Sequence, residues 1–201
     1  MRKKPDYYAD RAKKEGYPAR SVYKLEEFQN KFNIYKKGQA ILDLGAAPGS
    51  WSLYIARKTK CACTITAVDL KELNLNKIPR CLNFYQGDFL SPEIQEKLRE
   101  QGPYDAVISD AAPATTGNRT VDTGRSFTLA EEVMSIADKH LKTGGNFVCK
   151  VFQGGDEKEL LDRLKGKYEK AKALKPKACR KDSFETFLIG INKKKKPGHN
   201  S

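Results

Sequence analysis

Charged side chains stand where several apolar runs of this chain end. Asp69 follows Thr64–Val68, Asp88 comes soon after Leu82–Tyr85, Asp110 follows Asp105–Ser109, and Lys150 is the last residue of Asn146–Lys150. Short apolar runs that alternate with longer amphipathic stretches are typical of a parallel α/β sheet. The carboxyl ends of parallel strands meet at one edge, where such sheets bind ligands. We therefore expect these four groups to lie near one binding site.

The turn from Gly45 to Gly49 is the sharpest local motif, between a strand at Ala40–Leu44 and a helix from about Ser50 to Lys60. Small residues let a ligand approach the backbone closely. The two glycines are four residues apart, so neither the dinucleotide pattern G-x-G-x-x-G nor the phosphate-binding G-x-x-x-x-G-K-[ST] is present. The motif thus favours a ligand without a diphosphate.

A carboxylate for ribose hydroxyls should follow such a turn by roughly 20 residues. Asp69 lies 24 residues after Gly45. A nucleoside without a diphosphate fits best, and S-adenosylmethionine is such a molecule. Asp88 is placed to reach its adenine amine, and Trp51 to pack against it. The alternatives are that Asp69 only terminates a strand and that Trp51 belongs to the core.

Basic residues are concentrated at the two ends of the 201-residue chain, whose net charge is +13. Residues 1–37 carry eleven of them, and residues 165–196 carry a second group. This excess favours a polyanionic partner, with nucleic acid first and an anionic membrane second, although solvated surface charge is the alternative. We expect residues 1–37 to form a basic RNA-contacting segment and helix.

Cysteine and histidine usage argues against metal and disulfide sites. The chain has five cysteines, an odd number, and only two histidines, with Cys61-x-Cys63 as the sole close cysteine pair. This pattern does not indicate a disulfide framework or structural zinc, so we expect no metal. No apolar run approaches the roughly 18 residues of a membrane span, and no signal peptide is evident. We expect a cytoplasmic protein in a reducing compartment, without membrane contact.

The order of elements predicts one doubly wound domain over residues 1–192, followed by a basic, disordered tail at 193–201. Helices are expected at Ser21–Lys31, Pro92–Gln101, Ser126–Leu141 (closed by Gly144-Gly145) and Asp156–Lys167. The polar segment Ala111–Arg125 is expected to be a loop at the active edge. Ala171–Lys175 and Thr186–Asn192 are expected as the last strands.

Four motifs in order resemble the FtsJ/RrmJ family of RNA 2′-O-ribose methyltransferases. They are S-V-Y-K-L at Ser21–Leu25, D-L-G-A-A-P-G-S-W at Asp43–Trp51, S-D-A-A-P at Ser109–Pro113 and G-G-N-F-V-C-K-V-F-Q-G at Gly144–Gly154. The resemblance runs from about Asp6 to Asn192. It departs from the family where Ser50 replaces a second glycine and Ala111 replaces methionine, and neither change removes a charged group.

The resemblance implies a Rossmann-like S-adenosylmethionine-dependent methyltransferase fold, with a seven-stranded, mostly parallel sheet and an antiparallel final strand. It also implies a catalytic Lys-Asp-Lys-Glu tetrad, which here is Lys24, Asp110, Lys150 and Glu185. The implied cofactor-binding residues are Gly45, Gly49, Trp51, Asp69, Asp88 and Asp110. Without the resemblance, Lys24 would be one basic residue among many, and Glu185 a surface charge at a strand end.

Within the implied tetrad, Lys150 has the most demanding role, because it must accept a proton. A ribose hydroxyl must lose its proton as it attacks a sulfonium methyl group. Burial and a second ammonium, from Lys24, both favour the neutral lysine that can accept this proton. Asp110 is better suited to aim Lys150 and the methyl group, while Glu185 would orient Lys24 or contact the nucleotide.

The compact length, without an appended domain, looks most like the bacterial enzymes that methylate a uridine in large-subunit ribosomal RNA. We therefore expect a monomer that acts on ribosomal RNA within the large ribosomal subunit. The segment from Asp6 to Ser21 also resembles relatives that modify the tRNA anticodon loop, which leaves tRNA as an alternative substrate. A catalytically inactive RNA-binding protein of the same fold is the alternative from another class.

Overall fold

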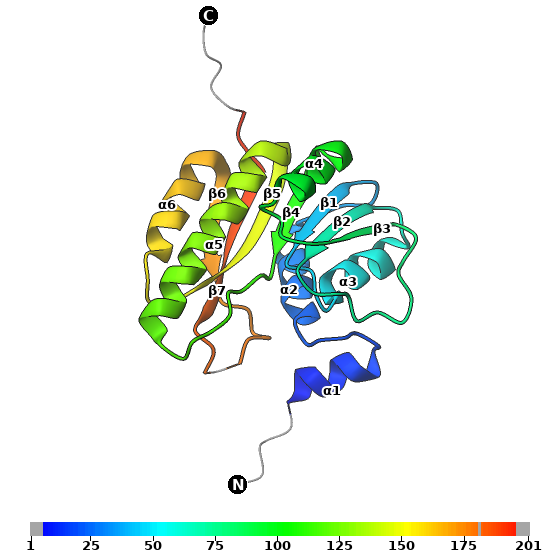
Figure 1. Ribbon diagram of the computed structural model, residues 1–201, viewed down its shortest axis with the longest axis horizontal. Coiled ribbons are helices and arrows are strands. Elements are labelled where there is room, and N and C mark those ends of the chain that lie inside the picture. The colour runs from blue at the N-terminus through cyan, green and yellow to red at the C-terminus, as the bar shows by residue number, and fades with distance from the viewer. Residues whose placement is uncertain (1–5, 181, 196–201) are drawn as a thin grey trace, which may run out of the picture.

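A computed structural model describes residues 6–180 and 182–195 as helices packed on one sheet (Figure 1). The helices are α1 (Tyr7–Lys14), α2 (Val22–Phe32), α3 (Ser50–Thr59), α4 (Pro92–Gln101), α5 (Arg119–His140) and α6 (Glu157–Lys167). The strands are β1 (Ala40–Leu44), β2 (Thr64–Asp69), β3 (Leu82–Gln86), β4 (Tyr104–Ser109), β5 (Leu141–Phe152), β6 (Tyr168–Leu174) and β7 (Glu185–Lys193).

The seven strands are ordered β3-β2-β1-β4-β5-β7-β6. Neighbours among the first five strands pair in parallel, whereas β7 is antiparallel to both β5 and β6. One hydrophobic cluster joins α2 and α3 to one face of the sheet, and a second joins α4, α5 and α6 to the other. The predicted fold class is confirmed. The order reverses between β1 and β4, so a ligand crevice belongs beyond their carboxyl ends.

The structure corrects both ends of the helix predicted at Ser126–Leu141. α5 begins at Arg119, because the Asn118 side chain caps it by accepting from the backbone N–H groups of Thr120 and Val121. Polar residues there act as a cap rather than as a loop. The helix ends at His140, and Gly144-Gly145 lie inside β5.

Both basic ends of the chain carry more structure than expected. Asp6 caps α1, an additional helix that the sequence pattern did not predict, by accepting from Ala9 N–H. β7 continues to Lys193, the first residue of the expected tail, whose ammonium group donates to the carbonyls of Ala137, Asp138 and Leu141. Residues 196–201, the rest of that tail, lie outside the described residues.

Cys61 and Cys81 form a disulfide with a Cα–Cα distance of 5.3 Å, so the expectation of no disulfide is wrong. The two cysteines are 20 residues apart in sequence, and the pairing of β2 with β3 brings them together. Close sequence spacing could not reveal this pair, because it depends on strand order. Cys63, Cys149 and Cys179 are free.

Gly190 in β7 offers a test of sheet packing. A Cβ atom at this position would lie 2.7 Å from the ring of Tyr168 in β6. We expect Gly190→Ala to lower the free energy of unfolding by about 1–3 kcal/mol through overpacking. Gly166→Ala in α6 is the matched control, because nothing lies within 4 Å of its Cβ and alanine favours the helix. Urea unfolding in which both variants behave alike would contradict this account.

Candidate active site

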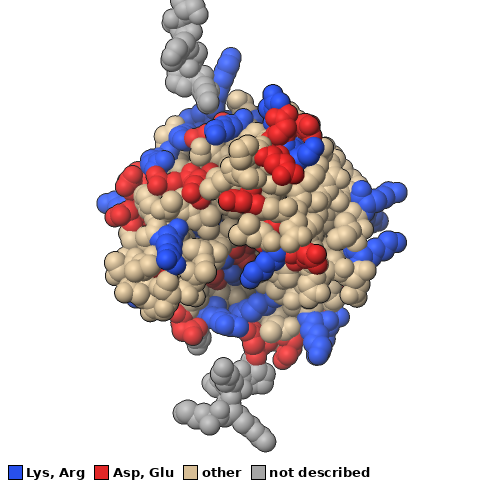
Figure 2. Space-filling model, viewed as in Figure 1, with Lys and Arg blue, Asp and Glu red and all other residues tan. Residues whose placement is uncertain are grey.

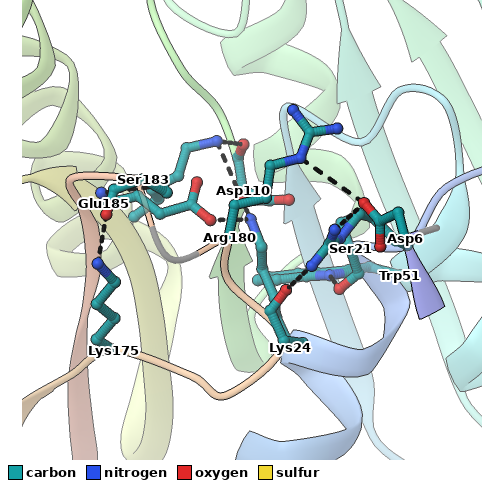
Figure 3. A network of polar contacts seen from close by, with 12 residues as sticks. Asp6, Ser21, Lys24, Trp51, Asp110, Lys175, Arg180, Ser183 and Glu185 are labelled. Atoms are coloured by element: carbon teal, nitrogen blue, oxygen red, sulfur yellow. Dashed lines mark hydrogen bonds and ion pairs between the residues drawn. The ribbon is translucent and has the colours of Figure 1, made fainter. Parts of the chain in front are cut away.

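Four charged side chains from four distant segments meet beyond the end of β4 (Figure 3). Lys24 Nζ lies 2.7 Å from a Glu185 oxygen and 3.4 Å from Asp110 Oδ1. Lys150 Nζ lies 3.1 Å from the same Asp110 oxygen. The predicted tetrad therefore forms one cluster, in which two ammonium groups and two carboxylates balance in formal charge.

Each member of the cluster is positioned by the packing of its own element. Lys24 lies in the first turn of α2 and is only 8% exposed. Lys150 comes from β5, and Glu185 is the first residue of the antiparallel strand beside it. Lys150 also donates a 2.5 Å hydrogen bond to the Asp110 backbone carbonyl, which fixes its ammonium group at the carboxyl end of β4.

Electrostatics favour charge on both members of the Lys24–Glu185 pair. Burial alone would lower the pKa of Lys24, but the charges of Asp110 and Glu185 hold that pKa above its ordinary value. Burial would raise the pKa of Glu185, but Lys24, with help from the Cys179 thiol and the Lys150 charge, holds it below its ordinary value. Glu185 thus carries its negative charge 2.7 Å from the Lys24 ammonium, a pairing that the sequence alone did not reveal.

Cys179 is a contact of the cluster that sequence reasoning missed. Its thiol donates a hydrogen bond to Glu185, and burial followed by this carboxylate raises the pKa of Cys179 to about 12. The thiol therefore stays protonated as a hydrogen-bond donor. No sequence spacing pairs residues 179 and 185, because they face each other across the β6–β7 connection.

The Gly45–Gly49 turn is held from two sides. Gly45 has a φ of +73°, and a Cβ there would lie 2.5 Å from the Ala111 Cβ, so glycine is required where the turn crosses the residues after β4. Asp69 accepts from the backbone N–H groups of Ala47 at 2.9 Å and Lys71 at 2.8 Å. Asp69 therefore sets the shape of the turn and terminates β2, and each of its oxygens keeps a second lone-pair site.

The surface around this turn fits an adenosyl group. Gly49, at φ +103°, is the N-cap of α3 without a side-chain cap, which leaves backbone N–H groups of the first turn for a ligand. Asp88 is exposed, and among the contacts found in the described residues its carboxylate accepts only from Leu90 N–H, through one oxygen. Leu70, beside Asp69, is 69% exposed. This exposed apolar side chain, which sequence reasoning missed, offers an apolar surface against which a base can pack.

Trp51 does not contribute its ring to this surface. The indole is 2% exposed and packs against Phe28 and Phe187 in the core. Its N–H donates to the Ser21 carbonyl at 2.8 Å, immediately before α2. The expectation that Trp51 packs against the cofactor is therefore wrong, and the alternative, that Trp51 belongs to the core, holds. Trp51 supports the start of α2, and through it the position of Lys24.

Asp43 is a second buried group beneath the site. Ser52 Oγ donates to its carboxylate at 2.7 Å, which joins β1 to α3. Burial, followed by the nearby charges of Asp110 and Asp69, raises the pKa of Asp43 to about 7 despite the Ser52 bond. Its carboxylate thus ties β1 to the first turn of α3, on either side of the Gly45–Gly49 turn.

Basic side chains surround the approach to the cluster. Figure 2 shows Lys and Arg atoms, interspersed with Asp and Glu, around a hollow on the side where α1 lies. A cavity of about 440 Å³ adjoins Lys24 and Glu185 and is lined in part by Arg20 and Arg180. Arg20 bonds to Asp6 and to the Ala178 carbonyl, which ties the start of α1 to the β6–β7 connection. The N-terminal segment is thus docked beside the site.

The described residues contain no helix long and apolar enough to cross a membrane. Nor do three or more His, Cys, Asp or Glu side chains group there in a way that could hold a metal ion.

Comparison with known proteins identifies the family. The family model for FtsJ-like methyltransferases matches residues 17–193. The chain belongs to this family. It is 53% identical, over 94% of both chains, to ribosomal RNA large subunit methyltransferase E of Treponema denticola. It is 46% identical to the protein of that name from Desulfosudis oleivorans, over 96% of this chain and 93% of the relative.

A crystal structure of a ribosomal RNA methyltransferase from Plasmodium falciparum matches this FtsJ-like methyltransferase with a TM-score of 0.78 at 30% identity. The match covers 88% of this chain and 98% of the other. The family and the enzyme class predicted from sequence are therefore confirmed. Human methyltransferase-like protein 13, solved with S-adenosylhomocysteine, has a TM-score of 0.54 at 16% identity, which shows the shared fold.

Proposed function

We propose that this FtsJ-like methyltransferase transfers a methyl group from S-adenosylmethionine to a ribose 2′-hydroxyl of large-subunit ribosomal RNA, with a uridine as the preferred target. The Lys24–Asp110–Lys150–Glu185 cluster beside the Gly45–Gly49 turn carries this proposal. The names of the two bacterial relatives support the substrate. We further propose that it acts in the cytoplasm as a monomer, on RNA within the large ribosomal subunit.

Four groups are proposed to bind the cofactor: the backbone of the Gly45–Gly49 turn, Asp69, Asp88 and Asp110. Bound there, S-adenosylmethionine supplies an electrophilic methyl group on a sulfonium, which is already a good leaving group. Asp69 offers oxygens to ribose hydroxyls, and Asp88 offers one to an adenine amine. Asp110 belongs to the tetrad, and the next residue, Ala111, packs against Gly45 of the turn, so Asp110 connects the two halves of the site.

In the tetrad, Lys150 is proposed to take the proton of the 2′-hydroxyl. Asp110 holds its Nζ through a carboxylate oxygen and a backbone carbonyl, and these two acceptors leave a third direction for the hydroxyl. Lys24, kept charged by Glu185, is proposed to hold the nucleotide. Because the transfer is an in-line displacement, positioning should supply much of the rate.

Mapping 2′-O-methyl groups tests the substrate. We expect one position of large-subunit ribosomal RNA to lose its methyl group in cells without the gene, and to regain it when purified protein and S-adenosylmethionine are added. Loss confined to a tRNA anticodon loop would reject the ribosomal assignment. Unchanged methylation of all RNA, with RNA binding retained, would support the inactive binding protein instead.

Asp88 provides a test of the cofactor site. We expect Asp88→Ala to weaken S-adenosylmethionine binding about tenfold, because an exposed carboxylate bonded to adenine is lost while the fold keeps its core. Calorimetry on the wild type and the variant measures this. Glu93→Ala, an exposed carboxylate in the first turn of α4, is the control and should bind normally. Equal affinity in all three proteins would remove Asp88 from the site.

The basic surface of α1 should contribute to RNA affinity through phosphate contacts. Lys13 and Lys14 are exposed on α1, on the same side of the molecule as the site (Figure 1). Each phosphate contact should add ~0.7 to the slope of log affinity against log salt for single-stranded RNA. We expect the replacement of both Lys13 and Lys14 by Gln to lower that slope by about 1.4 and to leave cofactor binding unchanged.

The matched control for this experiment is the double change of Lys97 and Lys139 to Gln. Lys139 is exposed and lies near the end of α5 that is remote from the site, and Lys97 in α4 is partly exposed and pairs with Glu100. Filter binding from low to moderate salt should give this control the wild-type slope. If both double variants lower the slope equally, RNA affinity follows net charge rather than α1.

A further inference from the structure

The cavity beside the tetrad has an aromatic wall that the family assignment does not explain. The cavity of about 440 Å³ is bounded by the start of α2, the end of β5 and the connection between β6 and β7. Phe152 and Phe184 form the wall, with ring centroids 4.6 Å apart in an edge-to-face arrangement. Lys24 and Glu185 lie on the same cavity, so a group seated against the rings is adjacent to the tetrad.

The two aromatic rings are fixed rather than loose. Phe152 is the last residue of β5 and is 8% exposed. The Phe184 carbonyl accepts a 2.6 Å bond from Gln153 N–H, which joins the residue to the end of that strand. The guanidinium of Arg119, at the start of α5, lies 5.6 Å from the Phe184 ring centroid. Phe184 is therefore held from two sides while remaining only half-buried on the cavity.

The cavity also has a cation that can meet a phosphate. Arg20 is occupied by Asp6 and by the Ala178 carbonyl. Arg180 is different, because its side chain is 70% exposed and its only charged contact in the described residues is Asp6 at 3.8 Å. Figure 3 shows Arg180 beside the cluster, above Lys24. An aromatic wall, a charged pair and an available arginine match the base, ribose and phosphate of one nucleotide.

We propose that this cavity takes the target nucleotide after it leaves its stack in the RNA, with the base against Phe184, the ribose at Lys24 and Glu185, and the 5′-phosphate at Arg180. This proposal rests on the proposed function, because that function places the ribose at the tetrad. Enzymes that do chemistry on a base extrude the nucleotide into a pocket, and stacking on an aromatic ring can replace the lost stack. Here the same exchange would present the ribose to the tetrad. Phe184 is then a positioning residue that tolerates different bases.

Two small ligands separate the contribution of the base to binding from that of the ribose and phosphate. Uridine 5′-monophosphate carries base, ribose and phosphate, whereas ribose 5′-phosphate lacks the base. We expect the wild-type protein to bind the first about tenfold more tightly, as stacking on one ring predicts. In Phe184→Leu the two affinities should converge to within about twofold, with ribose 5′-phosphate binding unchanged. Titrations followed by NMR measure the affinity of each ligand for each protein.

Three further variants make the result decisive. Phe184→Trp should keep or increase the preference for uridine 5′-monophosphate, which also shows that the position tolerates change. Arg180→Gln should weaken both ligands by a similar factor. Phe32→Leu, at the opposite end of α2, should behave as wild type.

The proposal is overturned if Phe184→Leu keeps the wild-type preference, or if neither ligand binds the cavity up to its solubility limit. Methylation of ribosomal RNA by the wild-type protein is measured in parallel. A lost preference together with absent methylation would sink the proposed function and leave the nucleotide pocket standing. Normal methylation with an unchanged preference would reject the pocket alone.

Discussion

Lys150→Ala should abolish methyl transfer while both binding steps survive. Removal of a general base typically costs roughly 10²–10⁴-fold in rate, so we expect a loss of at least about 100-fold in single-turnover methylation. Most of the cofactor affinity should persist, because Asp110 is the one proposed cofactor contact that bonds to Lys150, and the Gly45–Gly49 turn, Asp69 and Asp88 remain. RNA binding should persist as well, because this side chain is buried at the cluster.

Lys150→Arg distinguishes a proton acceptor from a positive charge. Arginine keeps the charge but does not lose its proton in proteins. We therefore expect the Arg variant to be about as inactive as the Ala variant. In the wild type, the rate should rise with pH until the neutral lysine predominates. An Arg variant with a near-normal rate, or a flat pH profile in the wild type, would show that Lys150 supplies only charge.

Lys139→Arg is the control for this substitution. It makes the same exchange on an exposed lysine at the end of α5. Normal transfer by this variant shows that any loss in Lys150→Arg belongs to the site.

The strand-end residues could be located from sequence because local patterns determine them. Apolar runs identify strands, and parallel pairing then brings Asp69, Asp110 and Lys150 to one edge. Lys24 and Glu185 differ, since their neighbourhoods do not distinguish them from other surface charges. Only the family resemblance selected them, and only the structure shows that they form a pair.

The errors of sequence reasoning share a physical cause. The start of α5 depends on the Asn118 cap and on Asp122, whose carboxylate accepts from Thr116 and Gly117. The burial of Trp51 depends on Phe28 and Phe187, which are distant in sequence. The disulfide depends on the order of strands. Each is a long-range or capping interaction that residue spacing does not encode.

Lys24→Met should destabilise the protein as well as stop the reaction. The Lys24–Glu185 pair is nearly buried, with side chains 10% and 15% exposed. Removal of one partner leaves a buried carboxylate without its cation, which costs about 3–5 kcal/mol. Chemical denaturation at neutral pH measures the loss. Lys97→Met, which breaks an exposed pair with Glu100, is the control and should cost under about 1 kcal/mol.

The pH dependence of this loss identifies its origin. The folded-state pKa of Glu185 is lowered, so its contribution is present above the ordinary carboxyl pKa and is lost as pH falls through the folded value. The folded-state pKa of Lys24 is raised, so its contribution holds below the ordinary lysine pKa and is lost as pH rises through the folded value. The stability gap between wild type and Lys24→Met should thus be widest near neutral pH and narrow in acid. A gap of equal size at acid and neutral pH would show that Lys24 stabilises through packing.

A double variant separates stability from catalysis. Lys24→Met with Glu185→Gln removes both charges, so no buried ion is left unpaired, and we expect most of the lost stability to return. Methyl transfer should stay at least about tenfold below wild type, because the cation proposed to hold the nucleotide is absent. If the double variant recovers both stability and rate, the pair is structural. If it recovers stability alone, Lys24 and Glu185 act on the nucleotide itself, and the rate loss should then appear mainly in KM for RNA rather than in cofactor affinity.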